Sequence, residues 1–374
     1  MSYLTMDLPE RKPREHTRRL QIGREDFGGV SKSVPLGDGA PVVVQSMLAC
    51  STNDVEACLT QIRVLADEGC SIIRLAVESS RDLAPFETIC KESLMPVVAD
   101  VHFDYRLAVE ASRRGAAKLR INPGNIGGMD KIDAVIDAAG EAGIPIRIGV
   151  NSGSLSDEIR AYEALGLAGK LVLSATKLVE HFETRSFKDI VLSVKAPYVD
   201  ETIEAYRTLS MVLPHIPLHL GVTEAGTAWA GSIRSAVGIG ALLAEGIGDT
   251  IRVSLTADPV EEIRVAHEIL AALNLSTVKK ATLISCPTCS RCKVDLISIA
   301  TEVEQRLGAI NEPLRVAVMG CVVNGPGEAA EADVGVACGK ESGAIFAKGK
   351  VLYTVEEGQI IEALFKELDT IIRV

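Results

Sequence analysis

The chain has 374 residues, of which 47% are hydrophobic and 24% are charged. This composition is typical of a globular protein with a sizeable core, and it excludes intrinsic disorder, collagen and a small disulfide scaffold. The formal net charge of −11 argues against a general nucleic-acid binder, which shows a basic face. We therefore expect no nucleic-acid partner.

The first residues carry several arginines and lysines without an apolar segment behind them, so a signal peptide is not predicted. No apolar run reaches the ~18 uncharged residues that a membrane span needs. We therefore expect a cytoplasmic protein with no membrane partner. In that compartment the nine cysteines are interpreted as thiols or metal ligands rather than as disulfides.

Eight short Val/Ile/Leu-rich runs alternate with amphipathic helical patterns through most of the chain. Such runs are typical of buried parallel strands. The expected strands are 42–47, 72–77, 96–101, 118–122, 145–150, 189–195, 218–223 and 250–255. Eight strand–helix units over roughly 235 residues predict an α/β fold, the (β/α)8 TIM barrel, because a doubly wound sheet uses only about five or six strands.

The pattern changes after a segment at 274–282 that is interpreted as a linker. Further strands are expected at 281–285, 314–319, 333–338, 343–347 and 350–354, with helices at 293–307 and 357–373. We assign residues 1–273 to the TIM-barrel domain with an N-terminal extension, and residues 274–374 to a small α+β domain.

Polar side chains recur inside the apolar barrel strands, near the carboxyl ends where barrel enzymes carry their active sites. Residues i and i+2 of a strand share a face, so neighbouring members of this set should point into one space. The polar positions are Arg74, Asp100, His102, Arg120, Asn122, Arg147, Asn151, Ser193, Lys195, His219, Arg252 and Ser254, with Glu224 just beyond the seventh strand.

Five of the eight strands place a cation at this end, whereas the nearby acidic partners are Asp100 and Glu224. Buried unpaired charges are costly, and ion pairs that merely fill the barrel do not account for all five cations. The pattern predicts a small polyanionic ligand, because arginine offers bidentate contacts to phosphate. The Gly-rich segment 122–128 is a weaker indication, since its backbone N–H groups would suit a phosphate.

The second domain contains a cluster of thiols: Cys286, Cys289 and Cys292 lie within seven residues, and Cys321 follows. A structural zinc site usually needs a second CxxC or a His pair, whereas an iron–sulfur cluster accepts CxxC with distant ligands. The spacing favours the cluster and leaves its fourth ligand open. Cys292 would complete a thiolate set, and Glu328 would supply one oxygen.

Several segments together resemble the 4-hydroxy-3-methylbut-2-enyl diphosphate synthase family, in its two-domain bacterial form. The similarity extends over nearly the whole chain. It is carried by ADVHFDYRLA (99–108), LRINPGNIG (119–127), IRIGVNSGSL (146–155), HLGVTEAG (219–226), GIGDTIRVSLTADPVEEI (246–263), CPTCSRC (286–292) and GCVVNGPGEA (320–329).

The resemblance implies reductive ring opening and dehydroxylation of 2-C-methyl-D-erythritol 2,4-cyclodiphosphate to 4-hydroxy-3-methylbut-2-enyl diphosphate, a step of isoprenoid biosynthesis. It implies a 4Fe–4S cluster whose ligands are Cys286, Cys289, Cys321 and Glu328. Glu328 is also expected to be catalytic, because a carboxylate is a more displaceable ligand than a thiolate, and Glu224 is the acid/base candidate. The implied substrate-binding residues are Arg74, Asp100, His102, Arg120, Asn122, Arg147, Asn151, Lys195, Arg252 and Ser254.

A homodimer is expected from the topology and from the resemblance. The helix after the eighth strand runs back ~22 Å at 1.5 Å per residue, so the cluster domain starts at the far end of its own barrel. We expect a head-to-tail arrangement in which the cluster of one chain faces the barrel of the other. The expected electron donor is flavodoxin or ferredoxin.

Two alternatives have other chemistry. The first is a phosphosugar- or pterin-binding barrel, similar to dihydropteroate synthase, with a purely structural zinc module. The second is a non-catalytic electron carrier, although such a protein needs no phosphate pocket. Cys338 is interpreted as a buried free thiol.

Overall fold

The computed structural model describes residues 16–23, 33–321, 329 and 331–372. The chain divides into two compact units, Met1–Ser276 and Thr277–Val374. Each unit has its own apolar clusters, and each is treated by itself below.

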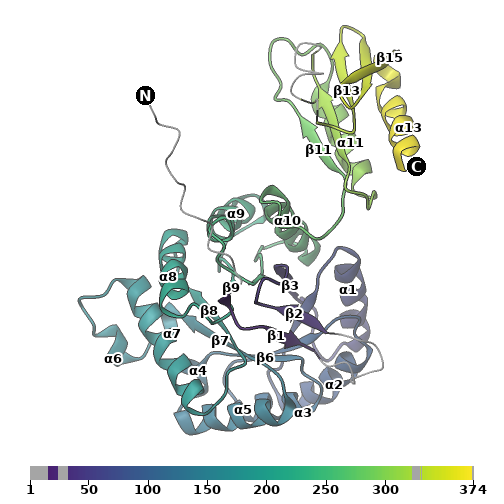
Figure 1. Ribbon diagram of the computed structural model, residues 1–374. Helices are drawn as coiled ribbons and strands as arrows, with labels where there is room; N and C mark the ends of the chain where they lie inside the picture. Colours follow the sequence, from purple (N-terminus) through teal and green to yellow (C-terminus); the bar gives the residue numbers. More distant parts are fainter. Residues whose placement is uncertain (1–15, 24–32, 322–328, 330, 373–374) are drawn as a thin grey trace. The chain divides into compact units, whose positions relative to one another are not determined.

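The first unit is a closed ring of eight parallel strands surrounded by helices (Figure 1). Its strands are β3 (Val43–Met47), β4 (Ile72–Ala76), β5 (Val97–Val101), β6 (Lys118–Ile121), β7 (Ile146–Asn151), β8 (Ile190–Lys195), β9 (His219–Leu220) and β10 (Thr250–Ile251). β10 pairs with both β3 and β9. A bridge between Leu192 and Leu218 closes the ring next to β9, so the predicted TIM barrel is confirmed.

The helices of the barrel follow the strands in alternation. They are α1 (Val55–Asp67), α2 (Leu83–Glu92), α3 (Tyr105–Arg113), α4 (Pro123–Ile126), α5 (Met129–Ala142), α6 (Asp157–Arg160), α7 (Leu167–Thr184), α8 (Val199–Val212), α9 (Ala228–Ala244) and α10 (Pro259–Ala272). Asp258 caps α10 by accepting a hydrogen bond from the N–H of Val260 at 2.9 Å, and Pro259 begins the helix as its fixed φ favours.

A hairpin that the sequence did not reveal closes the amino-terminal end of the barrel. Strands β1 (Leu20–Ile22) and β2 (Val34–Leu36) pair antiparallel. Their apolar side chains form one cluster with the first inward-facing layer of the barrel, namely Val43, Ile72, Val98 and Val191. The bottom of the barrel is therefore apolar.

Two of the expected strands were predicted too long. The strands predicted at 218–223 and 250–255 pair over only two residues each, in β9 and β10. The Gly-rich segment 122–128 contains the short helix α4, and a Cβ on Gly124 would lie 2.3 Å from the carbonyl oxygen of Ser154. A side chain at position 124 would therefore clash with the backbone of Ser154, which explains the glycine at this position.

The second unit contains a five-stranded sheet in the order β11-β12-β13-β14-β15. Its strands are β11 (Thr282–Ser285), β12 (Arg315–Met319), β13 (Val334–Gly339), β14 (Ser342–Ala347) and β15 (Lys350–Glu356), with helices α11 (Leu296–Leu307) and α13 (Ile360–Ile372). β11, β12 and β13 are parallel, and the last two strands run antiparallel. The expected α+β pattern is confirmed.

In the described ranges, none of the helices combines the length and the apolar character that crossing a membrane requires.

Candidate active site

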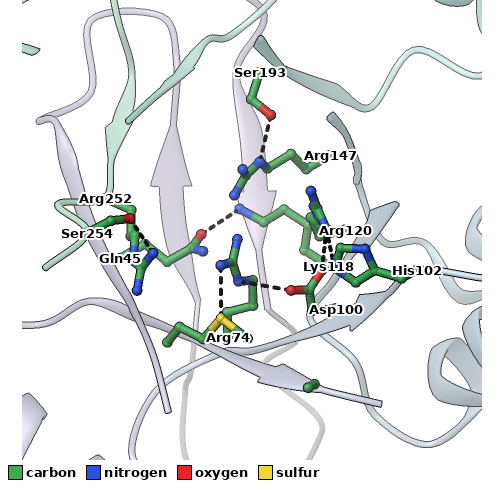
Figure 2. A network of polar contacts seen from close by, with 12 residues as sticks. Gln45, Arg74, Asp100, His102, Lys118, Arg120, Arg147, Ser193, Arg252 and Ser254 are labelled. Atoms are coloured by element: carbon green, nitrogen blue, oxygen red, sulfur yellow. Dashed lines mark hydrogen bonds and ion pairs between the residues drawn. The ribbon is translucent and has the colours of Figure 1, made fainter. Parts of the chain in front are cut away.

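Six basic side chains gather inside the barrel, and Figure 2 labels all of them except Lys195. We call them the cationic cup: Arg74, Lys118, Arg120, Arg147, Lys195 and Arg252. The first four are each at most 5% exposed. The five cations predicted from the sequence are therefore brought into one interior, as expected from strands that alternate their faces.

Asp100 on β5 holds two arginines of the cup. Its carboxylate lies 2.9 Å from Nη1 of Arg120 and 3.4 Å from Nε of Arg74. His102 joins this group, with Nε2 at 2.6 Å from Nη1 of Arg120. Burial alone would raise the pKa of Asp100, but the contact with His102 and the charges of Arg74 and Arg120 outweigh it and hold that pKa well below its usual range. Asp100 is therefore ionised.

Arg147 on β7 is the most deeply buried arginine of the cup, at 1% exposure. Its Nε donates to the hydroxyl of Ser193 on β8 at 3.1 Å. Burial, followed by the charges of Arg74 and Arg120, lowers its pKa. Lys195, at the end of β8, has a pKa lowered to about 6 by burial and by four neighbouring arginines, Arg147 first.

Arg252 lies just after β10 and has a partner that the sequence analysis missed. Its Nη2 is 3.1 Å from the carboxylate of Glu262 on α10, and its Nη1 donates to the hydroxyl of Ser254. Glu262 also accepts from the backbone N–H of Leu255 at 2.9 Å. Burial raises the pKa of Glu262 although Arg252 opposes this. Glu262, rather than Glu224, is the second acidic partner of the cup.

The cup contains more cations than the two carboxylates Asp100 and Glu262 can balance. Several of its polar N–H groups also point into the interior without a hydrogen-bond partner within the described part of the chain. These are Nε of Arg74, Arg120 and Arg252, and Nη1 of Arg147. Buried donors are normally satisfied, so the arrangement is suited to a small ligand with several anionic oxygens.

The predicted residues Asn122 and Asn151 follow β6 and end β7. Asn122 is occupied locally: its Nδ2 donates to the Ser154 hydroxyl at 3.0 Å, and its Oδ1 accepts from the N–H of Gly124 at 3.1 Å. Ser154 also links to Asn151, accepting from its backbone N–H at 3.3 Å. Ser154 thus ties the end of β6 to the turn that follows β7.

Glu224 lies on the loop between β9 and α9 and has a φ of 52°, a left-handed conformation that is strained for a residue with a Cβ. The loop is held in this shape by Arg234, whose Nη1 donates to the carbonyl of Ala225 at 2.6 Å. The backbone N–H of Thr256 donates to the carbonyl of Gly226 at 2.9 Å. Strain of this kind is often found at functional positions.

Two further residues of the interior were missed from the sequence, Lys118 and Gln45. Lys118 begins β6, two residues before Arg120, so the alternation rule that selected Arg120 also predicts that Lys118 points inward. Its Nζ lies 3.4 Å from Oε1 of Gln45 on β3. Glu262 had no comparable signal, because it lies on a helix ten residues after its partner.

In the second unit, Cys286 and Cys321 follow the ends of two neighbouring parallel strands. β11 and β12 pair up to Ser285 and Val318, which places the two cysteines at one edge of the sheet. The backbone N–H of Gly320 donates to Sγ of Cys286 at 3.1 Å. A Cβ on Gly320 would lie 2.8 Å from Sγ of Cys292, so a third thiol packs against the same turn.

Cys289 is exposed, and hydrogen bonds from the backbone and side chain of Arg291 lower its pKa, which favours the thiolate that metals bind. Cys338 is fully buried in the apolar cluster of this unit, where burial and the neighbouring Cys292 and Cys286 raise its pKa to about 12. Glu328 lies outside the described residues. The N–H···S bond at Cys286 and the thiolate donors fit an iron–sulfur group, although within the described ranges no three His, Cys, Asp or Glu side chains converge on one point.

The fold and the site define a class: a (β/α)8-barrel protein with a buried cationic cup, followed by an α+β unit that carries clustered cysteines. Family models identify the particular family. Residues 30–267 match the GcpE TIM-barrel domain, and residues 282–370 match the GcpE protein C-terminal domain. The chain belongs to the GcpE family.

Curated relatives match over nearly their full length. The protein of Caldanaerobacter subterraneus subsp. tengcongensis is 50% identical over 97% of this chain and 99% of its own. That of Symbiobacterium thermophilum is 51% identical over 94% and 92%, and that of Clostridium perfringens is 50% identical over 96% and 99%. All three are named 4-hydroxy-3-methylbut-2-en-1-yl diphosphate synthase (flavodoxin). Membership in this family decides against the pterin-binding alternative.

Proposed function

We propose that this chain catalyses the reductive ring opening and dehydroxylation of 2-C-methyl-D-erythritol 2,4-cyclodiphosphate to 4-hydroxy-3-methylbut-2-enyl diphosphate in isoprenoid biosynthesis. The reaction takes up two electrons and two protons and releases one water. The name of the relatives supports this assignment, and the cyclic diphosphate has the charge that the cationic cup is suited to bind.

The observation that carries the proposal is the excess of buried cations with unpaired N–H groups. A diphosphate offers negative oxygens to the unpaired N–H groups of Arg147 and Arg252, and charge-assisted hydrogen bonds of this kind are strong. Lys195 adds a compact charge at the end of β8. The remaining proposed substrate contacts are Asp100, His102, Arg120, Asn122, Asn151 and Ser254.

Glu224 is the proposed acid/base residue. Its loop is fixed by Arg234 and Thr256, so its carboxyl group is presented from a rigid backbone beside the seventh barrel strand. A carboxylic acid held near the departing hydroxyl supplies the proton with which that group leaves as water. The strained backbone at Glu224 is consistent with a position selected for chemistry rather than stability.

The proposed ligands of a 4Fe–4S cluster are Cys286, Cys289, Cys321 and Glu328. When bound, such a cluster would supply the electrons of the reduction one at a time. The chain's own contribution is the edge formed by β11 and β12, where the N–H of Gly320 stabilises the sulfur of Cys286. Flavodoxin, which the names of the relatives mention, or ferredoxin is the proposed electron donor, and the cytoplasm is the proposed location.

A head-to-tail homodimer is the proposed assembly, with the cluster of each chain facing the barrel of its partner. If this is so, one active site uses residues of two chains. Mixing a Cys286→Ser variant with an Arg147→Met variant should then restore activity in heterodimers, because one of the two sites is intact. Subunits must first be exchanged, which labelled chains verify, and absence of activity in verified heterodimers would contradict this arrangement.

The proposed reaction is tested by anaerobic incubation of the purified protein with the cyclic diphosphate and a chemical reductant. Product formation is followed by mass spectrometry, and the metal is identified by iron and zinc analysis and by electron paramagnetic resonance. We expect about four irons per chain and conversion to the hydroxymethylbutenyl diphosphate. A colourless protein that holds zinc and leaves the substrate unchanged would overturn the proposal.

A further inference from the structure

Lys118 is a buried basic residue to which the proposed reaction assigns no role. It begins β6, and its side chain is 0% exposed. In the sheet it pairs with Val98, which belongs to the apolar cluster closed by the β1–β2 hairpin. Lys118 therefore lies between the apolar bottom of the barrel and the layer of ion pairs above.

The hydrogen-bond partner of Lys118 is a neutral side chain. Its Nζ donates to Oε1 of Gln45 at 3.4 Å. Figure 2 shows the side chain running toward Gln45, with Arg74 and Arg147 drawn close by. The two carboxylates of the cup are already engaged, Asp100 with two arginines and Glu262 with Arg252. No salt bridge to Lys118 is found among the described residues.

The strands around Lys118 contribute further charged and polar groups. They are Gln45 on β3, Arg74 on β4, Asp100 on β5, Arg120 on β6 itself, Arg147 on β7, Ser193 and Lys195 on β8, His219 on β9, and Thr250 on β10. Burial, followed by the charges of Arg147 and Lys118, holds the pKa of His219 well below its usual range, so this histidine is neutral.

A cation in this position is destabilised by burial and by repulsion from the guanidinium groups. Arginine does not lose its proton in proteins, whereas lysine does so readily when it is buried. The lysines are therefore the groups through which the empty cup reduces its charge. Burial, followed by the charges of Arg147 and Arg74, lowers the pKa of Lys118 to about 7.

We propose that Lys118 is a proton-accepting positioning residue at the base of the cup, neutral while the cup is empty and protonated by a solvent proton when a diphosphate binds. The neutral amine allows Arg74 and Arg147 to remain buried side by side, and the ammonium adds a positive charge once the ligand has brought negative charge. The step balances because one N–H bond forms on the amine while a buffer acid releases the proton and becomes its conjugate base. The identity of the diphosphate rests on the proposed function, but the linkage itself does not.

The test is isothermal titration calorimetry of the holoenzyme near pH 8 in two buffers of different ionisation enthalpy, which counts the protons taken up per ligand bound. Inorganic pyrophosphate and the cyclic diphosphate are both used as ligands. The Lys118→Met variant retains the side-chain volume and removes the titrating group. We expect it to take up about one proton fewer than the unmodified protein.

Two further variants make the result specific. Lys188→Met changes an exposed lysine that precedes β8, and it should leave proton uptake unchanged. Lys118→Arg keeps a permanent charge, so it should also take up about one proton fewer than the unmodified protein, and it serves if the methionine variant does not fold. Equal uptake in the unmodified protein and a folded Lys118 variant would overturn the proposal.

The two ligands separate this inference from the proposed function. If pyrophosphate binding shows the Lys118-dependent uptake but the cyclic diphosphate is not converted, the inference stands and the proposed reaction fails. If the cyclic diphosphate is converted but uptake is the same with and without Lys118, the reaction stands and the inference fails.

Discussion

The cationic cup and the cysteine edge both place reactive groups at the carboxyl ends of parallel strands, but they hold them differently. The charged side chains of the cup come from strands between β4 and β10, and three of them, Arg74, Arg120 and Arg252, are held by ion pairs with Asp100 or Glu262. The thiols come from two neighbouring strand ends and an exposed loop, and one of them, Cys286, accepts a backbone N–H.

The difference indicates when each site is organised. The cup is assembled by folding, and burying its cations costs stability before any ligand arrives. Neutral thiols cost little free energy in the metal-free protein. Metal binding is what brings such ligands together. Changes in the cup should therefore alter ligand affinity with little effect on metal content, and changes in the cysteines should do the reverse.

The largest effect is expected from Cys286→Ser. Iron content should fall close to zero and turnover should be lost with it, because the electrons of the reaction pass through the cluster. Pyrophosphate affinity, measured by calorimetry, should not change. Cys338→Ala is the matched control, because its buried thiol lies in the apolar cluster, and it should retain its iron. A Cys286→Ser protein with full iron would remove this residue from the ligand set.

The second largest effect is expected from Glu224→Gln. The rate should fall by about 10²- to 10⁴-fold, the usual contribution of general acid catalysis, while the KM for the cyclic diphosphate stays within a few-fold, about 1 kcal/mol or less. The control is Glu261→Gln, on the exposed side of α10, which should behave as the unmodified protein. An unchanged kcat would assign proton donation to another group.

Arg147→Met should mainly weaken ligand binding. Loss of a charged donor from the cup should reduce pyrophosphate affinity by about 10- to 100-fold, since hydrogen bonds to charged groups contribute about 1.5–3 kcal/mol. The melting temperature should not fall, because the variant also removes a buried charge. Arg185→Met, which changes an exposed arginine after α7, is the comparison, and equal affinity in the two variants would contradict the role of the cup.

The smallest expected effect is the contribution of Lys118 to the pH dependence of the free energy of unfolding. The pKa of Lys118 is about 7 in the folded protein and ~10.4 in an unfolded chain. Between these values the unfolded chain binds more protons, so the free energy of unfolding should rise with pH by up to about 1.4 kcal/mol per unit. Denaturant titrations at several pH values measure this slope. It should be smaller in Lys118→Met, and an identical slope would show that Lys118 does not titrate there.

Much of the barrel could be predicted from the sequence because its strands are short, apolar and separated by helices. The same periodicity predicted that Arg74, Arg120 and Arg147 point inward, since residues on a strand alternate faces. Lys118 obeys the rule equally well but was overlooked as the first residue of its strand. The β1–β2 hairpin was missed because each of its strands has only three residues.

The pairing inside the cup could not be predicted in this way. Glu262 reaches Arg252 from a helix, and Asp100 on β5 links Arg74 on β4 with Arg120 on β6. These partners depend on strand register and on where the following helix packs. Neither is encoded in a local pattern.

The order of residues along the chain thus determined that cations outnumber carboxylates at the carboxyl ends of eight strands, and that thiols cluster after them. Closure of the barrel decided which N–H groups remain free and which lysine is cut off from water. The reason is that the burial and charge around a side chain depend on neighbours from distant strands, which come together only when the ring is complete.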